Sequence, residues 1–364
     1  MQFADMETPC LILDQERLKA NAAKMRSHCA ARGVALRPHL KTLKSIEAAK
    51  LATDGKMARI TVSTLREAEV FARAGFDDIL HAAGITPNKF DHVRRINTET
   101  GKQLTLTLDS IEMAQALVQS GLPNRAMIEI DCGEHRGGIE SGNNDLEGIA
   151  RVLGGQLAGI MTHAGHSYST NQIARIKEIA DDEVNAATTA AKRLRAAGIE
   201  VPIVSAGSTP TVLHAENLDG IDEMRCGIYM VWDLSQFGRG VCEREDIALT
   251  VLATVIGHNR SAGVLTVDAG ALAMSKDIGA NIFLPDARFG WLCDAKDLTP
   301  LGLSINTVHQ EHGTVTVKDP AIFDRLPIGT QVRILPGHAC LTAAGGYEGY
   351  HLLQGGFWPR FNGW

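Results

Sequence analysis

The chain has 364 residues, of which 45% are hydrophobic and 21% charged, as is usual for a globular protein. This length predicts one large domain and a smaller one. The formal charge of -6 argues against a nucleic acid or an anionic membrane as partner. No apolar run approaches the roughly 20 residues of a membrane helix, and the first residues do not resemble a signal peptide. Seven scattered cysteines without a Cys-x-x-Cys pair indicate a reducing cytoplasm.

Residues 14–245 alternate between short apolar or β-branched runs and helical patterns. Helices are predicted at 64–74, 110–120 and 171–197, and Thr64 to Glu67 resembles a capping box. The predicted strands cover 34–37, 59–63, 78–82, 103–109, 126–131, 157–163, 202–206 and 223–229. Repeats of this kind over roughly 230 residues predict an α/β fold, a (β/α)8 TIM barrel. A doubly wound sheet is the alternative, but the first strand is not followed by Gly-x-Gly-x-x-Gly.

The pattern changes after residue 246. Strand-like runs at 247–256, 263–268, 313–317 and 331–335 are separated by Gly, Pro and Asp turns. They predict a second, mostly antiparallel β domain over residues 246–364. The apolar stretch Cys10–Leu13, within about residues 1–13, is a candidate to join its sheet.

Lys41 lies in the sequence RPHLKT (37–42), directly after the predicted first strand. A lysine that points into a core from a strand end loses solvation, which lowers its pKa. Such an amine forms Schiff bases with pyridoxal phosphate or a carbonyl substrate. The alternative is a solvated loop lysine.

The loops after the carboxyl ends of barrel strands normally form the active site. Ser208 and Thr209 follow the seventh strand, and Gly227 and Ile228 lie at the end of the eighth. Small residues and hydroxyls at these two neighbouring loops favour a phosphate-bearing cofactor, although a turn or a helix N-cap explains each loop as well.

Three further residues follow the fifth and sixth predicted strands. Arg136 can present a cation to the cofactor ring, with a surface ion pair as the alternative. His163 and Tyr168 are candidates to orient or cover the ring, with buried, internally bonded side chains as the alternative.

His338 and Cys340 lie in the sequence LPGHAC (335–340) of the second domain. On an extended segment, residues two apart point to the same side, so these side chains are expected to converge. Imidazole and thiolate are typical zinc ligands. Two ligands leave positions for water or substrate, as a catalytic Lewis acid requires, although most His-x-Cys pairs are inert.

Collinear motifs along nearly the whole chain support a resemblance to a known family. They include RPHLKT (37–42), ITVSTLREAE (60–69), EIDCGEHRGG (129–138), THAGHSY (162–168), VSAGSTPT (204–211), RCGIY (225–229) and ILPGHAC (334–340). The sequence resembles the fold-type III pyridoxal-phosphate enzymes of the D-serine dehydratase and D-threonine aldolase group. It is most similar to the D-serine and D-threo-3-hydroxyaspartate dehydratases.

The resemblance implies a homodimer in which each chain has an alanine-racemase-like barrel and a C-terminal β domain, with the active site between them. It implies that Lys41 carries pyridoxal 5'-phosphate and that Thr209, Gly227 and Ile228 help to hold the phosphate. Arg136 and Tyr168 would lie beside the cofactor. His338 and Cys340 would bind a divalent metal, with zinc expected and manganese or cobalt as alternatives.

The resemblance also implies a reaction. The aldolases tend to have His-x-Asp at the metal position and the dehydratases His-x-Cys, so Cys340 favours dehydration. The expected substrate is a D-3-hydroxy amino acid, D-serine or D-threo-3-hydroxyaspartate, converted to a 2-oxo acid and ammonia. Metal-activated aldol cleavage and a non-enzymatic pyridoxal-phosphate carrier are the alternatives. A racemase would need a second base, and the sequence does not identify one.

Overall fold

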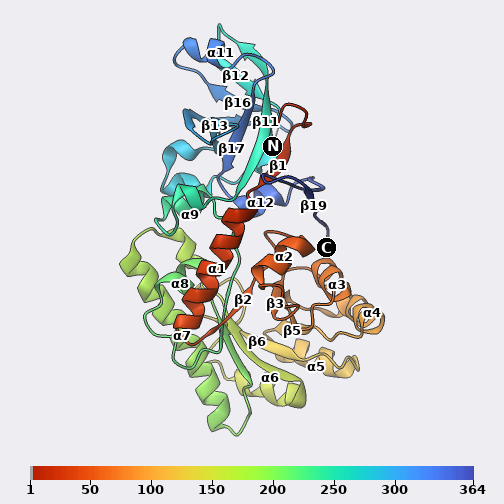
Figure 1. Ribbon diagram of the computed structural model, residues 1–364. Coiled ribbons are helices and arrows are strands. Elements are labelled where there is room, and N and C mark those ends of the chain that lie inside the picture. The colour runs from red at the N-terminus through yellow and green to blue at the C-terminus, as the bar shows by residue number, and fades with distance from the viewer. Residues whose placement is uncertain (1–2) are drawn as a thin grey trace. The chain divides into compact units, whose positions relative to one another are not determined.

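The chain folds into two compact units in the computed structural model, which describes residues 3–364 (Figure 1). The barrel unit comprises residues 23–41, 49–227 and 363–364. The sheet unit comprises residues 3–22, 42–48 and 228–362. Within the described part of the chain, no helix is both long and apolar enough to cross a membrane.

Parallel strands form the barrel and nearly close it. The strands, in their spatial order, are β2 (Ala35–Pro38), β10 (Glu223–Cys226), β9 (Ile203–Ala206), β8 (Leu157–Thr162), β6 (Ala126–Asp131), β5 (Thr105–Leu108), β4 (Ile79–Gly84) and β3 (Ile60–Val62). An isolated parallel bridge between His39 and Thr61 joins the first strand of this order to the last. This arrangement confirms the predicted (β/α)8 barrel. A short extra strand, β7 (Ile139–Glu140), pairs with β6.

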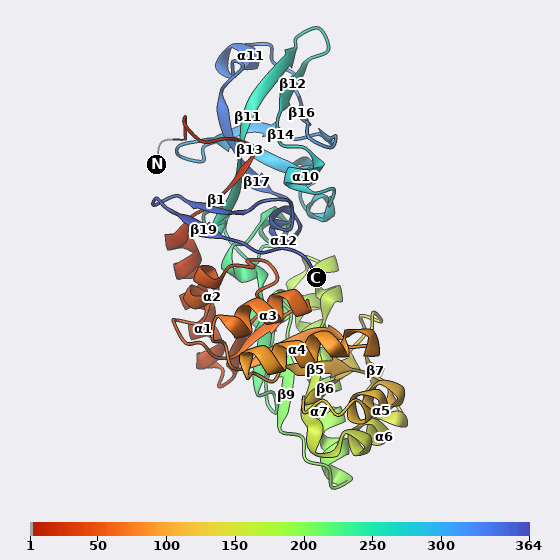
Figure 2. The ribbon, with the colours of Figure 1, turned by 90° about the vertical axis from the view of Figure 1, so that its right-hand side faces the viewer.

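Helices alternate with these strands, as the sequence predicts (Figure 2). They are α1 (Gln15–Ala31), α2 (Ile46–Ala52), α3 (Leu65–Arg73), α4 (Phe90–Thr100), α5 (Ile111–Gln119), α6 (Asp145–Leu153), α7 (Ile173–Ala196) and α8 (Thr209–His214). The Thr64 hydroxyl caps α3 by accepting the Glu67 N–H at 3.1 Å. The Glu67 carboxylate accepts the N–H of Ser63 at 2.9 Å, so the predicted capping box reaches one residue further back than expected.

The sheet unit contains a ten-stranded, mostly antiparallel sheet, which confirms the predicted second architecture. Its main path is β14 (Pro300–Ser304), β13 (Gly290–Asp294), β17 (Gln331–Pro336), β11 (Leu249–Asn259), β1 (Cys10–Leu13), β18 (Gly349–Leu352) and β19 (Phe357–Pro359). The strands β12 (Val264–Val267), β15 (Thr307–Val308) and β16 (Gly313–Thr316) branch from it. Among the described strands of this sheet, β1 and β18 form the one parallel pair.

The short helices of this unit were not predicted from the sequence. They are α9 (Leu234–Gly238), α10 (Ala271–Met274), α11 (Ala321–Arg325) and α12 (Ala339–Ala343). None exceeds five residues, so none is long enough to show a helical period in the sequence.

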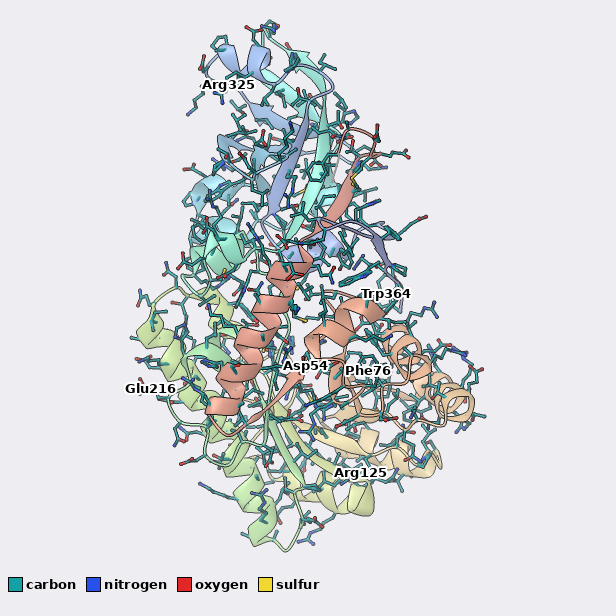
Figure 3. All side chains as sticks on the ribbon, in the orientation of Figure 1. Asp54, Phe76, Arg125, Glu216, Arg325 and Trp364 are labelled. Atoms are coloured by element: carbon teal, nitrogen blue, oxygen red, sulfur yellow. The ribbon has the colours of Figure 1, made fainter. Side chains whose placement is uncertain are left out.

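Each unit has its own apolar core. Leu80, Met127, Ala158 and Met161 form a buried cluster in the barrel unit. A second cluster in the sheet unit contains Phe3, Cys10, Ile12, Leu252 and Ala295. Phe76, labelled in Figure 3, is fully buried in the barrel unit, where its ring meets Phe71 edge-on at 5.4 Å. Burial of such apolar side chains is the main stabilising contribution to both units.

Candidate functional site

Lys41 lies three residues beyond the end of β2 and is exposed. The chain continues past the strand through the His39–Thr61 bridge and a hydrogen bond from the Leu40 N–H to the Thr61 carbonyl at 2.9 Å. Because Lys41 is exposed, the prediction of a lysine that points into the core is wrong, and the alternative of a solvated loop lysine describes its position. Its position at the carboxyl end of a barrel strand is the one that catalytic groups occupy in this fold.

His39 is an enclosed neighbour of Lys41 that the sequence analysis did not single out. The Lys41 N–H donates to its Nδ1 at 3.4 Å, and its Nε2 lies 3.4 Å from the Ser63 hydroxyl. Burial, followed by the positive charges of Lys41 and Arg225, holds the pKa of His39 well below its usual value. A neutral imidazole therefore lies beside the lysine.

His163 and Tyr168 lie in the loop after β8 and are brought near the loop after β9. His163 Nδ1 donates to the Gly207 carbonyl at 2.8 Å, and the Tyr168 hydroxyl accepts the Thr209 N–H at 3.1 Å. Their ring centres are 6.5 Å apart. Burial lowers the pKa of His163 to about 3, with a smaller effect from the charge of Lys41, although the bond to Gly207 opposes the shift. His163 is therefore neutral.

Ser208 and Thr209 differ in what their hydroxyls contact. Ser208 caps α8, and its Oγ also lies 2.8 Å from the Ser167 hydroxyl, so the N-cap alternative describes its contacts. Thr209 is fully buried, and its Oγ1 has no hydrogen-bond partner within residues 3–364. A buried hydroxyl without a partner costs stability unless a water or ligand satisfies it. Thr209 therefore fits a bound anionic group such as a phosphate.

Close backbone packing explains the glycines of these loops. Gly207 has φ 125°, and a Cβ there would lie 2.7 Å from the Arg225 amide nitrogen. A Cβ on Gly227 would lie 2.5 Å from the His39 carbonyl oxygen. The chain passes from the barrel unit to the sheet unit after Gly227, and Ile228 begins a short 3-10 helix, Ile228–Met230. Both glycines are required by the fold itself.

Glu183 is a buried carboxylate of α7 that the sequence analysis missed. It accepts the Ala164 N–H at 2.8 Å, the Gly207 N–H at 3.0 Å and the Thr211 hydroxyl at 2.7 Å. It therefore joins the loop after β8 to the loop after β9. Burial raises its pKa, against the effect of these hydrogen bonds. The signal that could have found it is an acidic residue within the apolar stripe of α7, which buries Ile176, Ala180 and Ala187.

Arg136 lies in the loop after β6, and, besides burial, its charge contributes to the lowered pKa of His163. Its side chain is 58% exposed, with Nη1 3.4 Å from Glu134 and Nη2 3.8 Å from Glu129. These contacts match the surface ion-pair alternative, and the role beside a cofactor stays a prediction.

His338 and Cys340 are brought together in the sheet unit, but by a different local structure from the one predicted. β17 ends at Pro336, His338 is the N-cap residue of α12, and Cys340 lies in the first turn of that helix. The expected extended segment is therefore wrong. The two side chains nevertheless lie within hydrogen-bonding reach of each other.

Side chains from other segments surround this pair. Asp277 Oδ2 is bonded to His338 Nδ1, and the Thr42 hydroxyl lies 2.9 Å from Cys340 Sγ. Thr42 is the residue that follows Lys41 in the sequence. Burial lowers the pKa of His338, but its bonds to Asp277 and Cys340 outweigh burial and raise it to about 11.

The donor set fits an open metal site and not a closed one. Over residues 3–364, no three His, Cys, Asp or Glu side chains converge as metal ligands. His338 and Cys340 offer one nitrogen and one sulfur, which suits zinc or a similar divalent ion with water completing the coordination.

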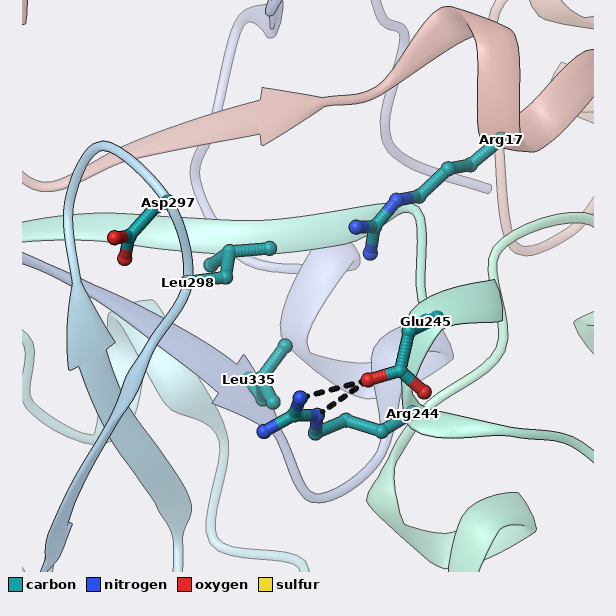
Figure 4. A pocket seen from close by; sticks show the side chains of 6 residues that line it. All are labelled: Arg17, Arg244, Glu245, Asp297, Leu298 and Leu335. Carbon is teal, nitrogen blue, oxygen red and sulfur yellow. Dashed lines mark hydrogen bonds and ion pairs between the residues drawn. The ribbon is translucent and has the colours of Figure 1, made fainter.

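A pocket of about 150 Å³ also lies in the sheet unit, but none of the predicted site residues lines it (Figure 4). Its lining contains Arg17, Arg244 and Glu245, and the two Arg244–Glu245 hydrogen bonds are drawn as dashed lines. Arg17 is paired with Asp14 at 3.2 Å. Because its charged groups already have partners, this pocket is not the candidate site.

Comparison with known families identifies both parts of the chain. The family described as "Alanine racemase, N-terminal domain" matches residues 13–234. The family described as "Putative serine dehydratase domain" matches residues 248–352.

Individual proteins are similar along their whole length. D-threo-3-hydroxyaspartate dehydratase of Delftia sp. is 40% identical, with 99% of this chain and 98% of that protein covered. D-serine dehydratase of Dictyostelium discoideum is 32% identical, with 96% and 94% covered. The crystal structure of an alanine racemase-like protein from Idiomarina loihiensis matches with a TM-score of 0.95 at 40% identity, covering 100% of this chain and 99% of that one. The chain therefore belongs to the family that joins an alanine racemase N-terminal domain to a serine dehydratase domain, and it is an enzyme of that family.

Proposed function

We propose that this enzyme is a pyridoxal-phosphate-dependent lyase that dehydrates a D-3-hydroxy amino acid to a 2-oxo acid and ammonia. The observation that carries the proposal is the placement of His338 and Cys340 together at the start of α12, with Asp277 bonded to the first and Thr42 beside the second. The family membership and the dehydratase names of the two similar proteins support it. D-serine and D-threo-3-hydroxyaspartate are the proposed substrates.

All residues of the proposed cofactor site except Ile228, which begins the sheet unit, lie in the barrel unit. Lys41 would hold pyridoxal phosphate covalently, and Thr209, with Ser208, Gly227 and Ile228, would hold the phosphate. His163, Tyr168 and Arg136 would lie beside the ring. The unpartnered, buried hydroxyl of Thr209 supports this assignment. When bound, the cofactor acts as an electron sink that stabilises the negative charge left by the α-proton.

Lys41 is the proposed base. Its Nζ would accept the α-proton of the substrate.

The proposed metal ligands are His338 Nε2 and Cys340 Sγ. A divalent ion at these atoms supplies Lewis acidity toward the β-hydroxyl, which is otherwise a poor leaving group. Zinc suits the nitrogen and sulfur pair, and manganese or cobalt are alternatives. Asp277 and Thr42 hold the two side chains in place.

A panel of D-serine, D-threonine and the 3-hydroxyaspartate stereoisomers tests the reaction. We expect ammonia and a 2-oxo acid from a D-3-hydroxy substrate, and loss of both products in the presence of a chelator. Glycine and an aldehyde would instead identify an aldolase. No turnover of any substrate by the cofactor-loaded protein would identify a carrier. Borohydride should fix the cofactor to the peptide that contains Lys41.

We also propose that the enzyme is a homodimer and lies in the cytoplasm. Leu272 and Leu341 are exposed large apolar residues on α10 and α12, which contact each other, and Ile278 and Ile282 are exposed in the segment that follows α10 in the chain. Apolar side chains gathered in this way favour a protein partner. All seven cysteines are free, which supports a reducing compartment. Sedimentation of the purified protein tests the dimer.

A further inference from the structure

Asp277 is the nearest charged neighbour of His338 outside its own segment. Its Oδ2 forms a hydrogen bond and ion pair with His338 Nδ1, across 61 residues of sequence. Both side chains are partly enclosed, with 27% of Asp277 and 35% of His338 exposed. The inference drawn from this contact rests on the metal site of the proposed function.

The Asp277 carboxylate is held by its own loop. Its Oδ1 accepts the Gly279 N–H at 2.8 Å, and its amide donates to the Ser275 hydroxyl at 3.3 Å. One oxygen is thus used to fix the loop, and the other is directed at the imidazole. The carboxylate cannot rotate away from His338 without losing its bond to Gly279.

The other nearby carboxylate, Asp233, has a different role. Its Oδ1 accepts the Gln236 N–H and its Oδ2 accepts the Ala339 N–H, both at 2.9 Å. Both oxygens are occupied by backbone groups at the starts of α9 and α12. Asp233 therefore fixes the helix that carries Cys340, and Asp277 alone of the two contacts the imidazole.

An acceptor at Nδ1 decides which imidazole tautomer is present. A carboxylate can only accept there, so when a metal ion displaces the second proton the remaining one stays on Nδ1 and the lone pair is left on Nε2. A histidine that binds a metal usually donates its other N–H to a carboxylate or carbonyl, which fixes the ring and makes it a stronger ligand. We propose that Asp277 is a positioning residue that holds His338 with Nε2 free to bind the metal ion.

Two substitutions of Asp277 separate this role from a purely structural one. Asp277→Asn keeps the oxygen that accepts from Gly279, but its amide group donates to Nδ1 and so moves the imidazole proton to Nε2. Asp277→Ala lets the ring choose either tautomer but leaves the Gly279 N–H without its acceptor. Both remove the same charge, so any difference between them does not come from charge.

The expected order of zinc affinity is wild type, then Asp277→Ala, then Asp277→Asn. Loss of such a contact typically weakens metal binding by about 10- to 100-fold. Without metal, Asp277→Ala should be less stable than Asp277→Asn, because alanine cannot accept the hydrogen bond from the Gly279 N–H. Zinc competition titrations and thermal unfolding measure the two quantities. Cobalt absorption should show weakened sulfur coordination in Asp277→Asn.

The control is Asp286→Asn, which removes the same charge from an exposed residue nine positions along the chain. It should bind zinc like the wild type. If His338→Ala and Cys340→Ala lose zinc but Asp277→Asn binds it within about twofold of wild type, or better than Asp277→Ala, the role of Asp277 is wrong and the proposed function stands. If His338→Ala and Cys340→Ala bind zinc as tightly as wild type, the proposed metal site and this inference both fail.

Discussion

His163 of the barrel unit and His338 of the sheet unit make the same kind of hydrogen bond, but their pKa values shift in opposite directions. Each ring is bonded at Nδ1, His163 to the Gly207 carbonyl and His338 to the Asp277 carboxylate. Burial lowers the pKa of His163 to about 3. For His338, burial acts in the same direction, but the carboxylate and Cys340 outweigh it and raise the pKa to about 11.

The difference shows that the acceptor, together with nearby charge, decides what a partly enclosed imidazole can do. Lys41, Arg225 and Arg136 surround His163 with positive charge, which disfavours a proton on the ring. His338 has carboxylates and a thiol around it. The barrel unit therefore supplies a neutral ring, and the sheet unit supplies a ring that keeps its proton until a metal ion displaces it.

The largest expected effect separates the two histidines by substitution. His338→Ala should lower dehydration by about 1,000-fold, because Lewis acidity is worth several kcal/mol, and should leave the absorbance of the lysine-bound cofactor unchanged. His163→Ala should weaken cofactor binding by about tenfold through the lost ring contact, with a smaller effect on turnover at saturating cofactor. Spectra and steady-state rates measure both.

Lys41→Ala serves as the reference for that comparison, because it should remove the covalent cofactor absorbance and turnover together. Loss of the cofactor absorbance in His338→Ala would contradict the assignment of His338 to the metal. Unchanged cofactor binding in His163→Ala would exclude His163 from the ring contact.

The barrel was predictable because its strands are short apolar or β-branched runs that alternate with helical patterns. The ends of the strands were less predictable. The eighth strand was predicted to run to Tyr229, but it stops at Cys226. The position of Lys41 after the first strand was predicted correctly, but its burial was not. Two residues outside the strand lie between the end of β2 and Lys41. Sequence pattern gives order along the chain better than it gives burial.

The sheet unit was less predictable, for reasons visible in particular strands. β14 begins with Pro300 and contains Gly302 at φ 68°, which are signals of a turn. It forms a strand because β13 pairs with it, a contact that no local pattern encodes. The partner of His338 was hidden in the same way, because Asp277 lies 61 residues away in a loop.

The second prediction concerns Glu183, which holds the loop residue Gly207 that His163 contacts. Glu183→Ala removes the acceptor of the Ala164 and Gly207 N–H groups and of the Thr211 hydroxyl. The Thr211 hydroxyl can still donate to the Ser208 carbonyl, but two buried N–H donors are left without partners, which should destabilise the barrel unit by about 3 kcal/mol. Because Gly207 also accepts from His163, cofactor affinity should fall as well. Urea unfolding and cofactor titration measure these effects.

The control for that variant is Glu178→Ala on the same helix, where an exposed carboxylate pairs with Arg175 at 2.8 Å. Its effect should be below about 1 kcal/mol. Equal destabilisation by the two substitutions would show that Glu183 does not hold the loops.

The smallest expected effect tests the charge state of His163 through acid stability. An unfolded histidine takes up a proton near pH 6.5, whereas folded His163 does so only near pH 3. The unfolded state therefore binds more protons between these values, so the stability contributed by a neutral His163 is complete above pH 6.5 and is lost as the pH falls. Between pH 7 and pH 5 this loss is at most about 2 kcal/mol.

His163→Gln cannot titrate, so it should lose less stability than wild type over the same pH interval. His39 and His81 also have lowered pKa values, but both are present in the two proteins and cancel in the difference. Urea midpoints at pH 7, 6 and 5 give the comparison. Parallel curves for the two proteins would mean that folded His163 is protonated in the same range as an exposed histidine. The contrast with His338 would then come from the Asp277 carboxylate alone and not from the positive surroundings of the barrel loops.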